Sequence, residues 1–541
     1  MSSYDYIIVG SGSGGGVVGA RLAEDPNISV LVLEAGGTDW NFVFHMGIGF
    51  YRNRPAHLNW GFQSEPEPHL DNRRIDLPQG RVLGGSSSIN GKVYSRGNPI
   101  DYDEWQQLGA EGWAYDDVLP YFKKAEGSWR GNTVSHGASG PLGTTAVNPK
   151  GTGQERLLEA AVNSGYKIVD DLDSEPFEGI TRSSDITVNN KGRRTSTART
   201  YLRPAMQRGN LAVHTHARVI RIIIENGRAV GIEYFRKGKR LRAYANREVI
   251  LSAGVYNTPR LLLLSGIGPA DDLRALGIKP VLDLPGVGTN IADHASVMLS
   301  FATHEQATPL RELRLDRAAV HFMRWALLGS GPFATQPLSA QGLIKTLPEL
   351  DRPDAQLFFN PLRRDAQIFV PGIMKSQEHR IEAAVVLLHP YSRGTLKLKS
   401  SNPDVPPSVR LNLMSDPRDM DTLVRAVRAA RAIHRTEPIK SMIKTEVAPG
   451  VDVDTDVELQ AFIRKTLYTV RHPVGSCRMG TDDLAVVDPE LRVRGIEGLR
   501  IVDASVMPRI PGGNTNAPTI MIGEKAADLI KGRTPLPRSI Q

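Results

Sequence analysis

The hydrophobic pattern at the start of the chain predicts a strand, a glycine-rich turn, a helix and a second strand. Residues 5–9 form a short apolar run, and apolar positions with helical spacing follow over residues 17–23. A second apolar run, residues 29–33, ends at the acidic residue Glu34. This order is that of the opening of a dinucleotide-binding βαβ unit.

The rest of the chain predicts strands with fewer helices. Residues 35–100 are rich in Gly, Pro and aromatic residues and show little periodicity, which predicts long ordered loops of functional importance. Residues 211–252 alternate between apolar and polar positions, as half-buried strands do. Further strands are predicted at 249–251, 383–388, 395–398 and 499–502, and helices at 259–264, after Asp416-Pro417, and from about Pro518 to residue 530.

Length and charge narrow the class of protein. A chain of 541 residues is too long for one hydrophobic core, so two or more domains are expected. The net charge of +8 is mild for this length, and the densest basic run, residues 236–242, has a central Gly and apolar flanks. It predicts a solvated hairpin tip, and we expect no nucleic-acid partner.

Cysteine usage and the apolar runs indicate a cytoplasmic protein. The single cysteine, Cys477, excludes an intrachain disulfide and a Cys-based zinc site, and His214 and His216 lack an evident third ligand, so no metal is expected. The first ten residues lack the features of a signal peptide. The best transmembrane candidate, residues 318–328, is far shorter than the ~20 residues that span a bilayer. A peripheral contact with a membrane surface stays open.

The first glycine cluster predicts a nucleotide site. Gly10, Gly12 and Gly15 lie between the first strand and helix, where they permit a tight turn, close approach of the backbone to a pyrophosphate, and helix–strand packing. The diphosphate is expected at the helix N-terminus. Glu34 follows by about 20 residues and suits the ribose hydroxyls. These residues alone do not distinguish FAD from NAD.

Five sequence blocks resemble the glucose–methanol–choline (GMC) oxidoreductase family. The blocks are residues 80–90, continuing to Asp103, then 254–268, 472–480, 503–508 and 514–524. The second departs from the family pattern at Val255. The resemblance covers essentially the whole chain and is greatest to the bacterial branch of alcohol, sorbose and choline dehydrogenases.

The resemblance implies an α/β protein, α+β overall, with a Rossmann-like FAD-binding domain and an antiparallel-sheet substrate domain. It places the FAD-binding domain at residues 1–155, 205–300 and 465–541, and the substrate domain at 156–204 and 301–464. The third FAD-binding segment would carry the catalytic residues. Aromatic residues of the substrate domain could line the pocket or simply belong to the core.

The resemblance also implies which residues contact FAD. Besides Gly10, Gly12, Gly15 and Glu34, these are Arg81, Gly84, Gly85, Ser86, Asn90, Val219, Ala253, Asp503, Ala504 and Asn516. Some relatives attach FAD covalently to a His where this chain has Ile89, so we expect non-covalent FAD. The helix near Pro518 would direct its positive end at the flavin.

The chemical step requires a base for the alcohol proton, and His suits that task near neutral pH. The family places its base at His472 and a His or Asn partner at Asn516, although Asn514 lies two positions away. Asn516 cannot titrate, so His472 is the expected base for hydride transfer to flavin N5.

We therefore expect an FAD-dependent enzyme that oxidises a primary alcohol, aromatic or medium-chain, to the aldehyde. A sugar or polyol dehydrogenase, a non-redox lyase of the same family, and a nicotinamide-binding module are the alternatives. The electron acceptor, whether oxygen, a quinone or another carrier, stays open, as does the oligomeric state.

Overall fold

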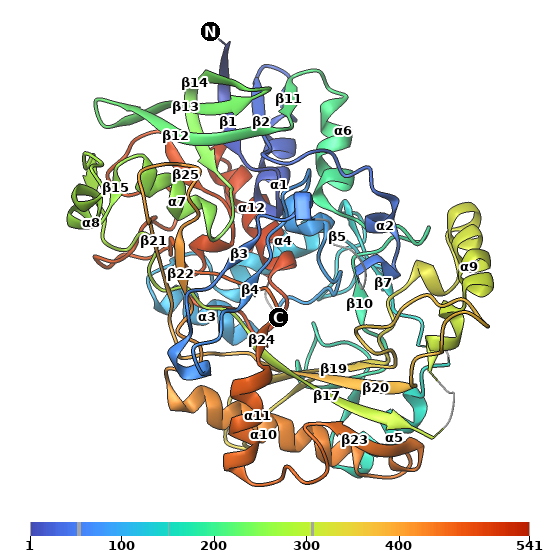
Figure 1. Ribbon diagram of the computed structural model, residues 1–541. Coiled ribbons are helices and arrows are strands. Elements are labelled where there is room, and N and C mark those ends of the chain that lie inside the picture. Colours follow the sequence, from blue (N-terminus) through green and yellow to red (C-terminus); the bar gives the residue numbers. More distant parts are fainter. Residues whose placement is uncertain (1, 51–55, 150, 305–307, 540–541) are drawn as a thin grey trace.

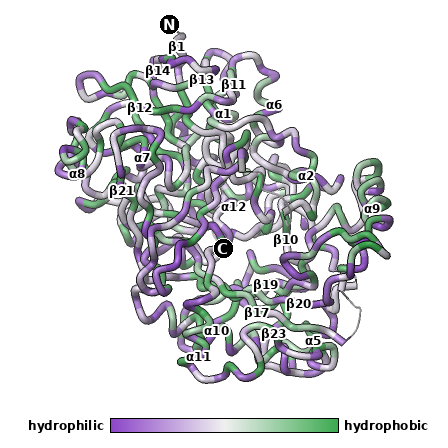
Figure 2. Tube along the Cα trace, in the orientation of Figure 1, coloured by the Kyte–Doolittle hydropathy of each residue, from purple (hydrophilic) through white to green (hydrophobic). Residues whose placement is uncertain are grey.

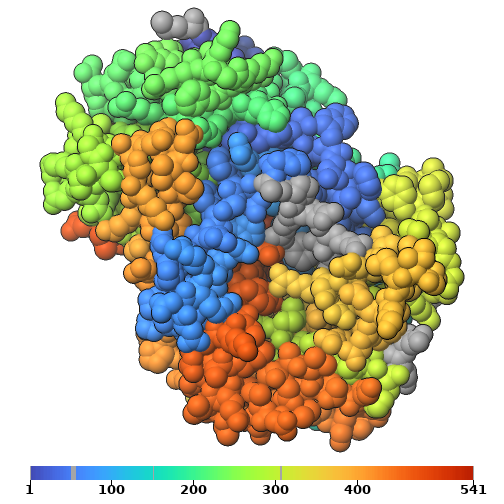
Figure 3. Space-filling model, in the orientation of Figure 1, coloured from blue at the N-terminus to red at the C-terminus, as the bar shows by residue number. Residues whose placement is uncertain are grey.

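The chain is organised around two large β-sheets. The computed structural model describes residues 2–50, 56–149, 151–304 and 308–539 (Figure 1). In the space-filling view, residues 56–100 lie between the lobe that carries β12–β14 (residues 217–251) and the lobe that carries α10 and α11 (residues 417–466) (Figure 3). The predicted α/β class with an antiparallel second sheet is confirmed.

The first sheet contains the predicted βαβ unit. β1 (Ser2–Val9) pairs in parallel with β2 (Val30–Leu33) on one side and with β14 (Lys239–Leu251) on the other, and α1 (Ser13–Leu22) connects β1 to β2. α12 (Asn516–Ile530) packs beside α1. The sheet order is β11 (Leu211–His214), β2 (Val30–Leu33), β1 (Ser2–Val9), β14 (Lys239–Leu251), β13 (Arg228–Arg236) and β12 (Ala217–Glu225), and β25 (Leu499–Ile501) also pairs with β14.

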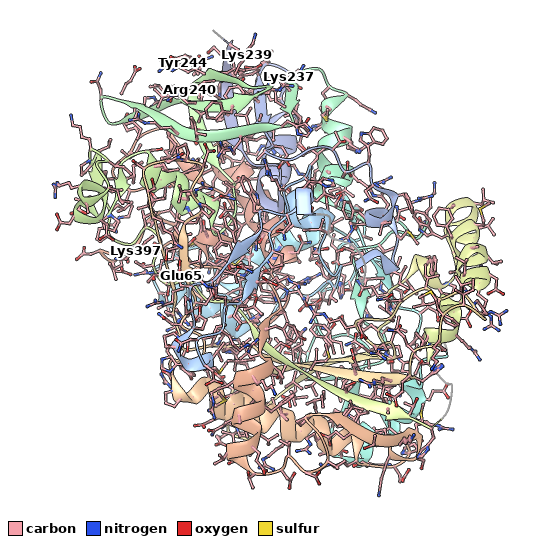
Figure 4. The ribbon with its side chains drawn as sticks, in the orientation of Figure 1. Glu65, Lys237, Lys239, Arg240, Tyr244 and Lys397 are labelled. Atoms are coloured by element: carbon pink, nitrogen blue, oxygen red, sulfur yellow. The ribbon has the colours of Figure 1, made fainter. Side chains whose placement is uncertain are left out.

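The predicted basic hairpin tip joins β13 to β14. Lys237 and Gly238 have φ values of 49° and 72°, the left-handed pair that matches the twist of a two-residue hairpin. Lys237, Lys239 and Arg240 lie at the edge of the molecule (Figure 4). Arg240 and Arg242 form ion pairs with Glu233 on the adjacent strand. Part of the basic charge is therefore neutralised within the hairpin itself.

The second sheet is mainly antiparallel. Its order is β23 (Ile443–Ala448), β17 (Ala295–Thr303), β20 (Arg380–Leu387), β19 (Ala355–Asn360), β18 (Ala340–Ile344), β9 (Gly179–Thr181) and β8 (Ile168–Val169), and β24 (Tyr468–Thr469) also pairs with β17. α10 (Pro417–His434) packs against β20 and β19. It begins as predicted after Asp416, whose carboxylate accepts a hydrogen bond from the backbone N–H of Arg418.

The remaining elements surround the two sheets. The other helices are α1 (Ser13–Leu22), α2 (Phe42–His45), α3 (Pro99–Gln107), α4 (Tyr115–Ala125), α5 (Gln154–Asn163), α6 (Arg203–Met206), α7 (Asn257–Leu264), α8 (Ala270–Ala275), α9 (Leu315–Leu328), α11 (Asp456–Thr466) and α12 (Asn516–Ile530). Two-stranded pairs are formed by β3 (Phe62–Gln63) with β4 (Asp76–Leu77), β5 (Glu126–Gly127) with β6 (Leu142–Gly143), β7 (Thr145–Ala146) with β10 (Asp185–Ile186), β15 (Ile267–Gly268) with β16 (Leu282–Asp283), and β21 (Thr395–Lys397) with β22 (Ser408–Arg410).

Two boundaries differ from the sequence analysis. α12 begins at Asn516 rather than near Pro518. β17 begins at Ala295 and so crosses the predicted domain boundary at residue 300. The domain limits stay predictions; their outermost residues, 1 and 541, lie outside the described residues, as do residues 51–55 of the predicted loop region.

The apolar segment at 318–328 forms most of α9, at the edge of the molecule. Leu327 and Leu328 are exposed there, and Figure 2 shows apolar positions of α9 interspersed with hydrophilic ones. Across the described ranges, no helix combines the length and the hydropathy needed to cross a bilayer.

A buried ionic cluster joins β5 to three loops. The Arg96 guanidinium donates to the Glu126 carboxylate over 2.5 Å. The His136 ring lies between Glu126, at 3.0 Å, and Asp171, at 2.7 Å. Although burial alone would lower the pKa of His136, these hydrogen bonds raise it to about 9. Hence His136 is protonated at neutral pH and completes a charge-balanced cluster.

We predict that His136 makes stability depend on pH. Because the folded pKa of about 9 exceeds the unfolded value near 6.5, the stabilisation is fully present below about pH 6.5 and is lost as the pH rises through about 9. It amounts to about 3 kcal/mol. The thermal midpoint of the wild type should therefore fall more between pH 7 and pH 9.5 than that of His136→Gln. Parallel curves for the two proteins would contradict this assignment.

Candidate active site

Two adjoining cavities lie between the sheets. The first, of about 210 Å³, follows the glycine turn and the ends of the parallel strands, and the second, of about 190 Å³, lies against the antiparallel sheet. Seven residues line both cavities: Ser86, Asn90, Gly91, Val93, Arg471, His472 and Asn514. We call these seven residues the junction. A group held in one cavity would meet a molecule held in the other at this place.

Glycines form the floor of the first cavity. Gly10 has a φ of 102°, and a Cβ there would lie 2.3 Å from the carbonyl oxygen of Ser252. A Cβ on Gly85 would lie 2.8 Å from the Cα of Gly12, so two glycine turns meet here. Gly12 caps α1 without a side-chain hydrogen bond, which leaves N–H groups of the first turn available to an anion. This floor fits the pyrophosphate of a dinucleotide.

Glu34 directly follows β2 and lies at the wall of the first cavity. Its carboxylate accepts hydrogen bonds from the backbone N–H groups of Ser11, at 3.2 Å, and Gly36, at 2.8 Å, and from the Ser11 hydroxyl. Burial raises its pKa above the ordinary value for Glu. These contacts hold the Glu34 carboxylate beside the glycine turn. Its contact with the ribose of the cofactor stays a prediction.

Most of the residues predicted to bind the cofactor line the first cavity. These are Gly10, Gly12, Glu34, Gly85, Ser86, Asn90, Val219, Ala253, Asp503, Ala504 and Asn516. Three do not line it. A Cβ on Gly15 would lie 2.1 Å from the Gly10 carbonyl oxygen, Gly84 donates its N–H to the Ser11 hydroxyl, and the Arg81 guanidinium lies over the Trp60 ring. A contact of these three residues with the cofactor stays a prediction.

The first turn of α12 also reaches the first cavity. Thr515, Asn516 and Thr519 line it, and Thr515 caps the helix without a side-chain hydrogen bond. The positive end of a 15-residue helix therefore faces the cavity and favours negative charge there.

His472 lies at the junction and contacts three groups. Its Nε2 is 3.1 Å from Nδ2 of Asn514, its Nδ1 is 3.0 Å from Nδ1 of His294, and its backbone N–H donates to the Asp293 carboxylate over 2.8 Å. The predicted partner, Asn516, makes a different contact: its amide oxygen accepts from the Ser13 hydroxyl at 2.8 Å. The structure thus brings Asn514, not Asn516, to the imidazole.

The hydrogen bonds define the tautomer of His472. Because the Asn514 amide donates to Nε2, the proton is on Nδ1 and is donated to Nδ1 of His294. Burial, with the positive charge of Arg471, lowers the pKa of His472 to about 3, and burial also lowers that of His294. Both rings are therefore neutral at neutral pH, and the single lone pair of Nε2 on His472 accepts the hydrogen bond of the Asn514 amide at the junction.

Strand pairing brings the two histidines together across 178 residues of sequence. Ala295 of β17 pairs with Thr469 of β24, and the backbone N–H of Val470 donates to the carbonyl oxygen of His294. His294, Asp293 and Asn514 were not among the site residues predicted from the sequence. The short spacing between Asn514 and Asn516 was the one sign that Asn514 could be the partner of His472. No feature of the sequence near His294 or His472 indicated that the two rings are in contact.

Comparisons with known proteins agree with this architecture. The family profile described as GMC oxidoreductase matches residues 4–296 in its N-terminal part and residues 390–523 in its C-terminal part. An oxygen-dependent choline dehydrogenase of Burkholderia multivorans is 43% identical over 542 residues, 99% of this chain and 95% of the relative. A relative of the same description from Burkholderia vietnamiensis is also 43% identical, over 99% of this chain and 95% of its own.

Solved structures show the same fold over almost the whole chain. Formate oxidase from Aspergillus oryzae RIB40 superposes with a TM-score of 0.91 at 26% identity, covering 98% of both chains. Pyridoxine 4-oxidase from Mesorbium loti gives 0.86 at 26% identity, covering 98% of this chain and 100% of its own. The two parts of the family profile together cover most of the chain and include the residues of the junction. The chain therefore belongs to the GMC oxidoreductase family, whose members are FAD-dependent enzymes that act on CH–OH donors.

Proposed function

We propose that this enzyme oxidises a primary alcohol, aromatic or medium-chain aliphatic, to the aldehyde. The observation that carries the proposal is the position of His472, a neutral imidazole whose Nε2 faces the junction of the two cavities. FAD in the first cavity would accept a hydride from the carbinol carbon. The second cavity is large enough for a small molecule and opens onto the same imidazole.

His472 and Asn514 would both act on the hydroxyl group of the substrate. The Asn514 amide, which donates to Nε2 of His472 over 3.1 Å, would turn to donate to the substrate oxygen, and the Nε2 lone pair that it releases would take the hydroxyl proton. The bond from His472 to His294 holds the imidazole in the required tautomer. Ile89 is 6% exposed and lines the second cavity; its hydrocarbon side chain supports non-covalent binding of FAD.

Several activities compete with this proposal. The named relatives are choline dehydrogenases, and choline is also a primary alcohol. A sugar or polyol dehydrogenase and a non-redox lyase are further alternatives. A panel of alcohols, assayed once with a dye acceptor and once with oxygen, separates these activities and identifies the acceptor; a panel in which no alcohol bleaches the flavin anaerobically would overturn the proposal.

We predict that His472→Ala lowers kcat by at least ~100-fold, the usual effect of losing a general base. Among the described side chains, the imidazole of His472 is the only proton acceptor that contacts the Asn514 amide at the junction. The visible absorbance of the purified variant should show that FAD is still bound. Retention of most of the activity, with full FAD content, would show that another group takes the proton.

Asn514 and Asn516 provide a matched pair of amides two positions apart. We predict that Asn514→Ala lowers kcat/KM by ~10-fold or more, since an oriented hydrogen bond to the substrate oxygen is lost. Asn516→Ala should lower kcat/KM less and should mainly weaken FAD retention, because its amide binds Ser13 beside the glycine turn. The reverse ranking of the two variants in kcat/KM would restore Asn516 as the partner of the base.

A further inference from the structure

The second cavity has two arginines in its wall. Arg471 directly precedes His472 and is partly buried, while Arg364 is exposed and lines the same cavity. The Arg364 guanidinium lies over the Tyr468 ring, 4.7 Å from its centroid. We infer that this pair of guanidinium groups forms an anion subsite and that the substrate alcohol carries a carboxylate at the end remote from its hydroxyl; this inference rests on the proposed function.

Neither guanidinium group is neutralised by the protein. Within the described part of the chain, neither Arg364 nor Arg471 forms an ion pair, and the side chain of Arg471 forms no hydrogen bond. An arginine without a partner at a cavity wall is free to bind an anion in the bidentate geometry that carboxylates prefer.

The acids nearby are already engaged by backbone groups. The Glu382 carboxylate, which lines the same cavity, accepts the backbone N–H of Arg364 over 2.9 Å, and burial raises its pKa. Asp293 accepts the backbone N–H of His472, and burial raises its pKa to about 7. The cavity therefore keeps an excess of positive charge, because two arginines face a single lining carboxylate.

The backbone holds Arg471 in an unusual conformation. Its φ of 70° lies in the left-handed region, which a residue with a Cβ occupies only when its surroundings impose it. β24 precedes it and the bonded His472 follows it, so both sides fix the turn. Burial and the positive charge of Arg364 lower the pKa of Arg471 to about 10, which leaves it charged at neutral pH. A bound anion would relieve the repulsion between the two arginines.

The rest of the second cavity suits a hydrocarbon body. Its apolar lining is provided by Ile89, Met298, Leu338 and Phe358. A substrate with a hydroxymethyl group at His472, an aryl or alkyl body along these residues, and a carboxylate at Arg364 and Arg471 would match the base, the apolar lining and the two arginines. A quaternary ammonium group in the same place would face two like charges.

The test compares substrates that differ only in the remote group. With the FAD-loaded enzyme, kcat/KM for 4-(hydroxymethyl)benzoate should exceed that for benzyl alcohol by ~10- to 100-fold, the size of a charge-assisted hydrogen-bond pair, and choline should be the poorest of the three. Arg471→Met and Arg364→Met should each remove most of this preference while benzyl alcohol turnover changes less. Arg471→Lys should restore part of it.

A matched control and a binding measurement separate this subsite from general charge effects. Arg363→Met removes the neighbouring arginine, which pairs with Asp365 instead of lining the cavity, and should leave the preference unchanged. Calorimetric titration with benzoate, which cannot be oxidised, should show weaker binding in Arg471→Met and Arg364→Met than in the wild type and in Arg363→Met.

The outcomes distinguish the two proposals. If no alcohol is oxidised, the proposed function fails, while benzoate binding that depends on Arg471 and Arg364 would still support the anion subsite. If benzyl alcohol is oxidised but the carboxylate is not preferred, or if choline is the best substrate, the anion subsite is overturned and the alcohol oxidation stands. Equal loss of benzoate binding in all three arginine variants would also overturn the subsite.

Discussion

The hydrogen bond between the imidazole rings of His294 and His472 is the contact on which the site depends. It joins two distant segments of the chain, since His294 directly precedes β17 and His472 follows β24, the strand that pairs with β17. The pairing of β17 with β24 fixes both backbones, and the Asp293 carboxylate holds the N–H of His472. One tautomer follows, and with it a lone pair directed at the junction of the cavities.

The walls of the two cavities differ in composition because each cavity binds a different kind of group. The first needs backbone groups close to an anion, so glycines meet where any Cβ would collide with a neighbouring carbonyl or Cα, and two helix N-termini face it without side-chain caps. The second has side chains of the antiparallel sheet in its wall and can vary in charge without disturbing that backbone. Cofactor binding and substrate choice are therefore separable properties of this fold.

The sequence predicted those features that local physics determines. The strand, glycine turn, helix and second strand of residues 2–33 follow from periodicity and from the steric demand at Gly10, and the helix after Asp416 follows from its capping residue. The choice between Asn514 and Asn516 depended on where α12 begins. Because the helix starts at Asn516, that side chain turns to Ser13, and Asn514 is left in the loop that meets His472. The role of His294 could not be predicted from the sequence, since only the pairing of β17 with β24 places it at the site.

The proposed reaction depends on a neutral His472 that assists the removal of a hydride from an alcohol carbon. The most direct measurement is anaerobic mixing of the purified enzyme with benzyl alcohol and with the same alcohol deuterated at the carbinol carbon, following the visible absorbance of the oxidised flavin. We expect the absorbance to be lost with both alcohols and the loss to be several-fold slower with the deuterated one, because the C–H bond breaks in that step. An unchanged absorbance with alcohols, or bleaching at the same rate with both, would contradict it.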